Sequence, residues 1–274
     1  MTELDSKVPK WATAAFHQMV GQSERLSQTV HLAMKGISFT QNAEKVAELI
    51  NRIDDNNADA EGRDRLRRAR EETELAKREV AQGFPVLHSQ AVVTEWAYLE
   101  ACVRRLVADW IQNEPTCLKN EAFEKVRVRL ADYERLDATE KAFFVVDTLE
   151  RECGAGLQSG VARFEVLLSA LGLNGEVPGL LRQRIFELGQ VRNIVMHRAG
   201  LVDKKFADAC PWLKVPIGEA LLITHKMYVV YSRAVHDYHM LIICRVAERF
   251  GMDVDAERRE VVERNTSLAS TTGE

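Results

Sequence analysis

Apolar side chains recur every three or four residues along most of this chain, which is the spacing of amphipathic helices. The pattern predicts a first helix over about residues 8–37 and a shorter one from about Thr40 to Ile53, before the polar turn DDNNAD. Further helices are expected at about residues 61–82, 86–111, 121–135, 138–153, 161–173, 178–200 and 219–250. No run of residues alternates between apolar and polar over a convincing strand length. The sequence therefore predicts an all-α fold.

The segment EGRDRLRRAREETELAKREVAQG, residues 61–83, combines a thin apolar stripe with dense charges of both signs. The stripe has a heptad-like spacing and consists of Leu66, Ala69, Thr73, Ala76 and Val80. It is too weak for a solitary coiled coil, so we expect the segment to lie against the same chain or against a partner protein. A solvated helix face is the common alternative for such a run of charges.

Gly83 and Pro85 interrupt the helical pattern and mark the expected domain boundary. The chain becomes far more apolar after this point. We therefore expect a helical N-terminal extension over residues 1–84, a helical bundle over residues 85–251, and a charged, Ser/Thr-rich tail over residues 252–274. The N-terminal extension is a candidate coiled coil or partner-binding region.

Composition narrows the class of protein. With 274 residues and 46% hydrophobic content the chain can bury a full core, and its net charge of −4 argues against a wholly basic nucleic-acid binder. Six basic and two acidic residues between Leu181 and Lys205 nevertheless give a local excess of four positive charges. This patch suits phosphate groups, although on charge alone an ordinary basic helix face explains it equally well.

The expected location is cytoplasmic. The five cysteines are an odd number and contain no C-x-x-C pair, which is typical of a reducing compartment. The opening MTELDSKVPK lacks the apolar segment of a secretory signal. The best candidate for a membrane span, the apolar run after Gly218, is interrupted by charged residues and histidines, so we expect no membrane association.

One stretch in the second half of the chain, PGLLRQRIFELGQVRNIVMHRAG, contains an arginine at an unusual position. Pro178 suits the start of a helix and Gly200 suits its C-terminal cap. At 100° per residue an apolar stripe forms from Leu181, Ile185, Leu188 and Val195, and Arg192 falls near its middle. An arginine keeps its charge, so burying it without a partner costs several kcal/mol. We therefore expect an interface or an anion-binding site at this position.

His197 and Asn193 are four residues apart and share one side of this helix, while Arg192 lies one step round. A histidine titrates near neutral pH, so it can give or take a proton at a phosphate ester. A fixed cation such as Arg192 can stabilise the charge of a phosphorane, and Asn193 can orient the histidine or a ribose hydroxyl. RNA needs no metal for this chemistry because its 2′-OH is an internal nucleophile.

Other signatures of enzymes are absent from the sequence, including the Walker loop, G-x-G-x-x-G, H-E-x-x-H and G-x-S-x-G. His236 and His239 are three residues apart and could contact one metal ion, but further ligands at metal-binding spacing are missing. We interpret this pair as structural and expect neither a metal nor a cofactor.

RNIVMH at the end of a core helix resembles the Arg-x4-His signature of the HEPN superfamily (higher eukaryotes and prokaryotes nucleotide-binding domains). The resemblance covers residues 85–251: a long first helix with an acidic residue, the motif helix, a loop containing PWL, and a long closing helix. The first 84 residues are not covered. The resemblance implies an HEPN-like helical bundle with a helical N-terminal extension.

The resemblance also implies a function. Many HEPN proteins are metal-independent endoribonucleases of prokaryotic toxin or antiphage systems, and they act as dimers whose motifs meet at the interface. For this chain it implies RNA as substrate, a homodimer through the motif helix, and Arg192 and His197 as catalytic residues supported by Asn193. A supporting acid would be Glu95 or Glu100, between which helix geometry does not decide.

Further RNA contacts are expected from the basic residues after the motif, namely Arg198, Lys204 and Lys205. The products would be a 2′,3′-cyclic phosphate and a 5′-hydroxyl. The alternative function is a non-catalytic HEPN-like module for dimerisation or for binding nucleic acid or a partner, with Arg192 in an interface ion pair. A protein partner is a further expectation for the N-terminal helices.

Overall fold

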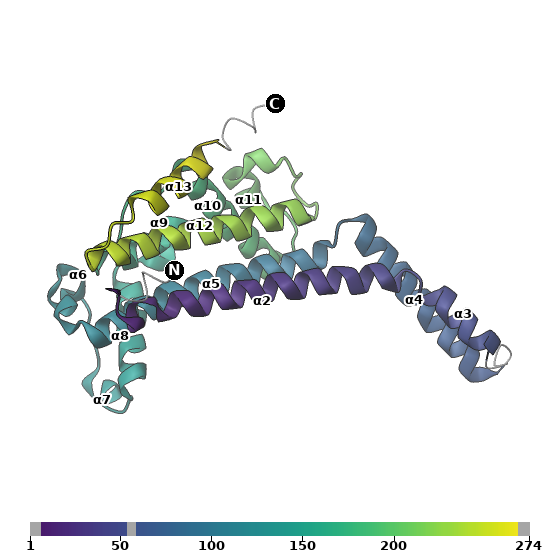
Figure 1. Cartoon of the computed structure of the whole chain (residues 1–274), viewed down its shortest axis with the longest axis horizontal. Coiled ribbons are helices and arrows are strands. Elements are labelled where there is room, and N and C mark those ends of the chain that lie inside the picture. The colour runs from purple at the N-terminus through teal and green to yellow at the C-terminus, as the bar shows by residue number, and fades with distance from the viewer. Residues whose placement is uncertain (1–6, 54–58, 268–274) are drawn as a thin grey trace.

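The computed structural model describes residues 7–53 and 59–267, with the side chain of Ser267 left aside. The described chain is all-α, and within it β pairing is limited to one isolated bridge between Leu201 and Ala220. A helical body carries a long arm (Figure 1). In the part of the chain that the structure describes, no helix is long and apolar enough to cross a bilayer.

The helices follow one another with short connections. The N-terminal half contains α2 (Lys10–Thr40), α3 (Ala43–Ile53), α4 (Ala60–Ala81) and α5 (Pro85–Asn113). The middle contains the turn η1 (Pro115–Lys119), α6 (Glu121–Glu124), α7 (Leu130–Tyr133), α8 (Ala138–Glu152), η2 (Ala155–Leu157) and α9 (Val161–Ser169). The last part contains α10 (Gly179–Arg198), α11 (Lys204–Ala209), η3 (Pro211–Leu213), α12 (His225–Arg249) and α13 (Asp255–Ser267).

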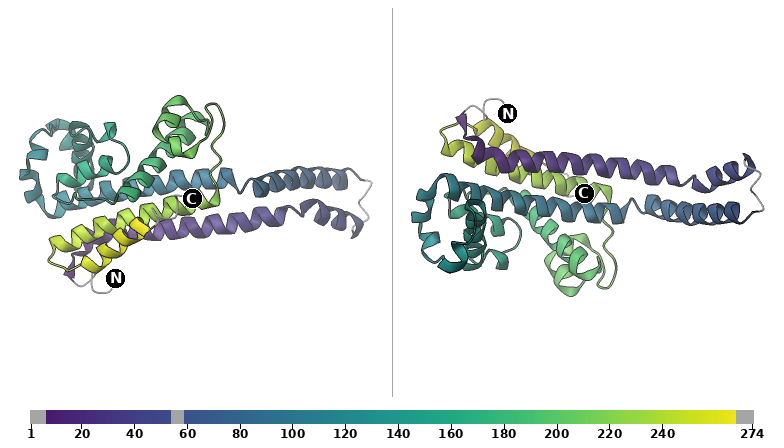
Figure 2. Two further views of the ribbon diagram at one scale, coloured as in Figure 1. Left: turned by 90° about the horizontal axis from the view of Figure 1, so that it is seen from above. Right: turned by 90° about the horizontal axis from the view of Figure 1, so that it is seen from below.

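Helix α5 is the centre of the body. It packs against α2, α8, α9, α10 and α12, and its inward residues Leu99 and Leu106 are completely buried. The two long helices α2 and α5 lie side by side along the molecule in both further views (Figure 2). Phe16 and Met19 of α2 belong to the same hydrophobic core as α5. The core therefore continues across the position, residues 84–85, at which the sequence predicts a domain boundary.

Helices α3 and α4 form the arm, which projects beyond the body (Figures 1 and 2). Helix α4 packs on α3 and on the end of α2, and its buried residues are small: Gly62, Ala69, Thr73 and Ala76. Helix α3 buries only Ala47 and Asn51. Its large apolar side chains, by contrast, are exposed: Val46, Leu49, Ile50 and Ile53.

Two predicted helices differ from the observed ones. The segment 121–135 is interrupted at 126–129, which have no regular secondary structure and include the β-branched Val126 and Val128. The helix expected from residue 219 begins at His225, because the Thr224 side chain caps it by accepting a hydrogen bond from the backbone N–H of Met227. Residues 218–221 instead bond to the backbone of 200–202.

Part of the expected C-terminal tail is helical. Helix α13 packs on α12, with Val261 buried and Asn265 donating a hydrogen bond to Asp237 at 3.0 Å. The remaining Ser/Thr-rich residues, 268–274, lie outside the described part of the chain.

Candidate functional site

Helix α10 carries the Arg192–His197 motif and is fixed along its inner side. Leu181, Ile185 and Leu188 are completely buried. At Gly189 the helix approaches the body so closely that a Cβ atom would lie 3.1 Å from the Trp96 ring of α5. Only a glycine fits this contact without displacing the ring. The packing therefore sets both the height and the rotation of the motif helix.

The end of α10 is closed by a left-handed cap. Ala199 has φ of 52° and Gly200 has φ of 79°, and the Gly200 N–H donates to the Ile194 carbonyl at 3.0 Å. This pattern satisfies a carbonyl that the helix itself leaves open. The expected glycine cap is present, but the first left-handed position belongs to an alanine.

The buried stripe of α10 is rotated from the one that the sequence predicts. Val191 and Ile194 are buried at its end, whereas Val195 is only partly buried. Arg192 consequently lies at the edge of the stripe and is partly exposed. The arginine can therefore reach solvent beside the core, and the rotation removes the cost of a fully buried charge.

The structure brings Arg192 and Asn193 together. The Arg192 guanidinium donates to the Asn193 side-chain oxygen at 3.1 Å. Among the described residues Arg192 forms no ion pair with a carboxylate. Four residues after Asn193, His197 is exposed in the last turn of the helix. The guanidinium thus retains donors for an anion, next to an accessible imidazole.

The basic residues after the motif differ in their pairing. Arg198 lies 3.5 Å from Asp203, and Lys204 lies 3.1 Å from Asp208. Lys205 is exposed and has no ion pair within the described chain. Of these three residues after the motif, Arg198 and Lys204 are thus partly neutralised by carboxylates, whereas Lys205 is unpaired in the described chain.

Neither glutamate that the sequence suggests as a supporting acid contacts the motif. Glu95 is buried and accepts hydrogen bonds from the hydroxyls of Ser23 at 3.0 Å and Ser232 at 3.1 Å. Burial raises the pKa of the Glu95 carboxyl, and the two hydroxyls oppose this shift. Glu100 pairs with Arg163 at 2.7 Å. In the described chain, both carboxylates are engaged away from the motif trio.

A different glutamate, which the sequence analysis did not select, anchors the loop after α10. Glu187 accepts a hydrogen bond from the Tyr231 hydroxyl at 2.5 Å and another from the Trp212 indole. Burial, followed by the nearby Glu187 charge, raises the pKa of Tyr231 far above its ordinary value. Tyr231 therefore remains a neutral donor, and the contact fastens the PWL turn to α10 and α12. The signal in the sequence was the tryptophan of the PWL segment.

A second polar region lies between α2, α12 and α13. This groove has a volume of 450 Å³, and its polar lining includes Ser23, Ser27, Ser232, Arg233, His236 and Arg264. Ser23 occupies an apolar position in the helical pattern of residues 8–37, which was the available signal for it. The groove borders the buried Glu95 through Ser23 and Ser232 and is distinct from the motif trio.

His239 lines the same groove, but its side chain is buried and packs in the core. Its ring packs 5.0 Å from Phe16 and 6.5 Å from the ring of His236. Burial, with smaller contributions from His236 and His17, lowers the pKa of His239 to about 3. The described residues contain no group of three His, Cys, Asp or Glu side chains suited to hold a metal ion.

Comparison with protein-family models, with curated proteins and with solved structures finds no match to this chain.

Proposed function

We propose that this chain is a metal-independent endoribonuclease of HEPN type that acts as a homodimer. In this proposal His197 is the general acid and base, Arg192 stabilises the transition state, and Asn193 orients Arg192 or the substrate ribose. The biological setting proposed is a prokaryotic toxin or antiphage system acting on RNA in the cytoplasm.

The observation that carries the proposal is the state of Arg192. Arg192 lies at the edge of the core, and its guanidinium is accessible and keeps donors that no carboxylate of the described chain occupies. Within the described chain the Arg192 guanidinium donates a side-chain hydrogen bond to the Asn193 amide and forms no ion pair, one turn before the exposed His197. Such an arrangement is suited to receive an anion from outside the chain, and a phosphodiester is the anion that the neighbouring imidazole can act upon.

The reaction needs only groups of the RNA and of this site. The 2′-oxygen attacks the adjacent phosphorus while an imidazole takes the 2′-OH proton, and an imidazolium donates a proton to the departing 5′-oxygen. The P–O2′ bond forms and the P–O5′ bond breaks, giving a 2′,3′-cyclic phosphate and a 5′-hydroxyl. Arg192 would stabilise the additional negative charge on the phosphorane oxygens. Two copies of His197 at a dimer interface would provide the base and the acid separately.

Exposed apolar side chains beside the motif support a dimer contact at this helix end. Met196 is 54% exposed between Val195 and His197, and Leu201 and Leu222 are close to half exposed on the adjoining loop. A two-fold axis here would cover these side chains and bring the two motifs together. The proposed RNA contacts, Arg198, Lys204 and Lys205, follow directly along the chain.

The test is cleavage of end-labelled RNA in the presence of EDTA by the full chain and by His197→Ala and Arg192→Ala. The proposal expects the wild type to produce cyclic phosphates and each variant to lose at least about 100-fold in rate, which is typical for removing a general acid/base or a charge-stabilising donor. His31→Ala, on α2, and Arg182→Ala, at the start of α10 and far along the helix from His197, are controls at exposed positions.

Two outcomes would contradict the proposal. Equal cleavage by the wild type and both motif variants would show that the activity comes from another site or a contaminant. Cleavage that stops on adding EDTA would contradict the metal-independent mechanism. Identical thermal unfolding of the variants and the wild type would show that a lost activity does not reflect lost folding.

The second candidate function is a non-catalytic interaction module, and the arm favours it. Several large apolar side chains of α3 and α4 are exposed, as they are on surfaces that bind partners. If the wild type binds labelled RNA or a second chain but leaves RNA intact under all conditions, this candidate replaces the nuclease.

A further inference from the structure

The arm presents two connected apolar grooves along one side of α4. The first, here called the tip groove, has a volume of 560 Å³ and lies between α3 and α4 around Phe39, Val46 and Ile50. The second, the base groove, has a volume of 480 Å³ and lies where α2, α4 and α5 meet around Ile37, Leu75 and Val86. Both grooves include Thr40 and Glu72, so they form one continuous surface.

Polar contacts between α3 and α4 keep the large apolar side chains of α3 exposed to solvent. Asn51 donates to the Gly62 carbonyl at 2.8 Å and accepts from Arg65 at 3.1 Å. On the same face of the hairpin, the Glu44 backbone N–H donates to the Thr73 hydroxyl at 3.0 Å. These bonds fix the rotation of α3 on α4. The large apolar side chains therefore remain exposed even though the hairpin is closed, with Leu75 at 52% and Phe39 at 73%.

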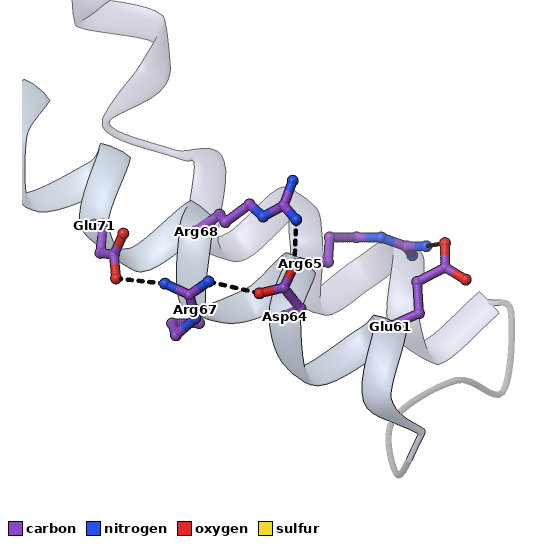
Figure 3. A network of polar contacts seen from close by, with 6 residues as sticks. All are labelled: Glu61, Asp64, Arg65, Arg67, Arg68 and Glu71. Carbon is purple, nitrogen blue, oxygen red and sulfur yellow. Dashed lines mark hydrogen bonds and ion pairs between the residues drawn. The ribbon is translucent and has the colours of Figure 1, made fainter.

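Charge along α4 is divided into two halves of opposite sign. Residues 60–70 contain five arginines and two acidic residues, whereas residues 71–81 contain four glutamates and two basic residues. Much of this charge is paired within the helix, as for Arg67 and Arg68, which share Asp64 (Figure 3). In the base groove, Glu72 and Glu79 form no ion pair with any described residue. In the tip groove, Arg68 has a 69% exposed side chain.

We infer that the arm docks on a second copy of this chain, with the two α4 helices antiparallel across a two-fold axis. In this arrangement the arginine-rich half of each α4 faces the glutamate-rich half of its partner, and the apolar side chains of both grooves are covered. The two grooves together form a self-complementary surface, so the contact closes after two copies. A parallel arrangement would place like charges opposite one another.

The same charge pattern excludes a partner of a single sign for the whole surface. In the tip groove, Glu61 pairs with Arg65 and Asp64 pairs with Arg68, so these arginines offer little attraction to RNA or an anionic membrane. In the base groove, Glu72 and Glu79 would repel either of them. An antiparallel copy satisfies both ends at once. The inference rests on the arm alone and holds whether or not the motif of α10 is catalytic.

The experiment measures the association of the full chain by sedimentation equilibrium at low salt. Arg68→Glu and Glu79→Arg each place two like-charge pairs in the two-fold contact, so each is expected to weaken the dimer at least tenfold. The double variant, Arg68→Glu with Glu79→Arg, restores opposite charges in every pair. It is expected to dimerise within about threefold of the wild type.

Matched controls lie on the same helix outside both grooves. Arg67 pairs with Asp64, as Arg68 does, and its side chain is 61% exposed, so Arg67→Glu makes the same charge change as Arg68→Glu. Glu74→Arg makes the same charge change as Glu79→Arg, at a glutamate whose side chain is 71% exposed. Both controls should dimerise like the wild type, and unchanged helical circular dichroism should show that all variants fold. Leu75→Ser should weaken the dimer without any change of charge.

Three results would overturn the inference. The first is a wild-type chain that remains monomeric throughout the measured concentration range. The second is a dimer that tolerates both single charge reversals. The third is a dimer that is lost in Met196→Asp but kept in Arg68→Glu, because this would place the interface at the end of α10 instead.

Discussion

The body and the arm bury opposite kinds of residue. In the body, large side chains such as Leu99, Leu106 and Tyr238 are completely enclosed. In the arm, the enclosed residues are small or polar, such as Ala47 and Asn51, and the large apolar ones face outward. Hydrophobic burial thus sets the packing of the body, whereas close backbone approach and directed hydrogen bonds set the packing of the arm.

This contrast predicts a difference in stability within one molecule. A fully buried leucine contributes about 1.5–3 kcal/mol relative to an exposed one, whereas surface ion pairs such as Arg67–Asp64 contribute about 0–1 kcal/mol. The arm contains several pairs of the second kind and few buried side chains of the first kind. We therefore expect the arm to open locally at a lower free energy than the body.

The largest effect is expected from removing a core side chain of the body. Leu99→Ala should lower the free energy of unfolding by about 2–5 kcal/mol, because Leu99 is completely buried at the centre of α5. Leu75→Ala, at a half-exposed position of the arm, should change it by less than about 0.5 kcal/mol. Urea denaturation of the monomer measures both, and similar losses in the two variants would remove the contrast between body and arm.

The body should also be acid-sensitive at His239. The pKa of this histidine is about 3 in the folded state, well below its ordinary value of 6.5. The unfolded chain therefore binds more protons below pH 6.5, and stability should fall as the pH falls through that value, by up to about 1.4 kcal/mol per pH unit. His239→Gln should flatten the dependence between pH 6.5 and pH 4. His31→Gln, at an exposed position, should leave it unchanged.

The arm has its own decisive residue in Asn51. Asn51→Ala leaves the Gly62 carbonyl without its donor and removes an acceptor from Arg65, at an expected cost of about 1–3 kcal/mol. Because the main packing partner of α3 among the described elements is α4, amide exchange should accelerate in α3 and α4 and stay unchanged in α5 and α12. Exchange mass spectrometry locates the effect, with Arg52→Ala as an exposed neighbour for control. A uniform acceleration would mean that arm and body open as one unit.

The fold class and most helix positions could be predicted because apolar spacing reports directly on helices. The outward orientation of α3 could not, because the spacing of Val46, Leu49, Ile50 and Ile53 reveals an apolar face but not what covers it. The start of α12 at His225 was also missed. Two contacts decide it: the local cap formed by Thr224, and a backbone pairing of residues 218–221 with residues 200–202, which is a tertiary contact.

The candidate site was predictable to the level of one helix. The sequence placed Arg192, Asn193 and His197 at the end of a core helix, where the structure has them. The sequence could not decide between Glu95 and Glu100. Glu95 accepts a hydrogen bond from Ser23, and Glu100 forms an ion pair with Arg163, and both partners are distant in the sequence. Contacts of this kind depend on which faces of α2, α5 and α9 meet, and helical periodicity alone does not contain that information.

The smallest effect is expected at Ala199, one of the described residues that adopt left-handed backbone without being glycine. Ala199 is exposed at the end of α10, so Ala199→Gly should relieve strain and raise the free energy of unfolding by about 0.5–1 kcal/mol. Phe84 joins the arm to the body with φ of 60°, but its side chain is buried. Phe84→Gly should therefore destabilise the protein, because the lost burial exceeds the relieved strain. Thermal unfolding separates the two signs, and stabilisation by both variants would show that the joint between arm and body depends on backbone geometry alone.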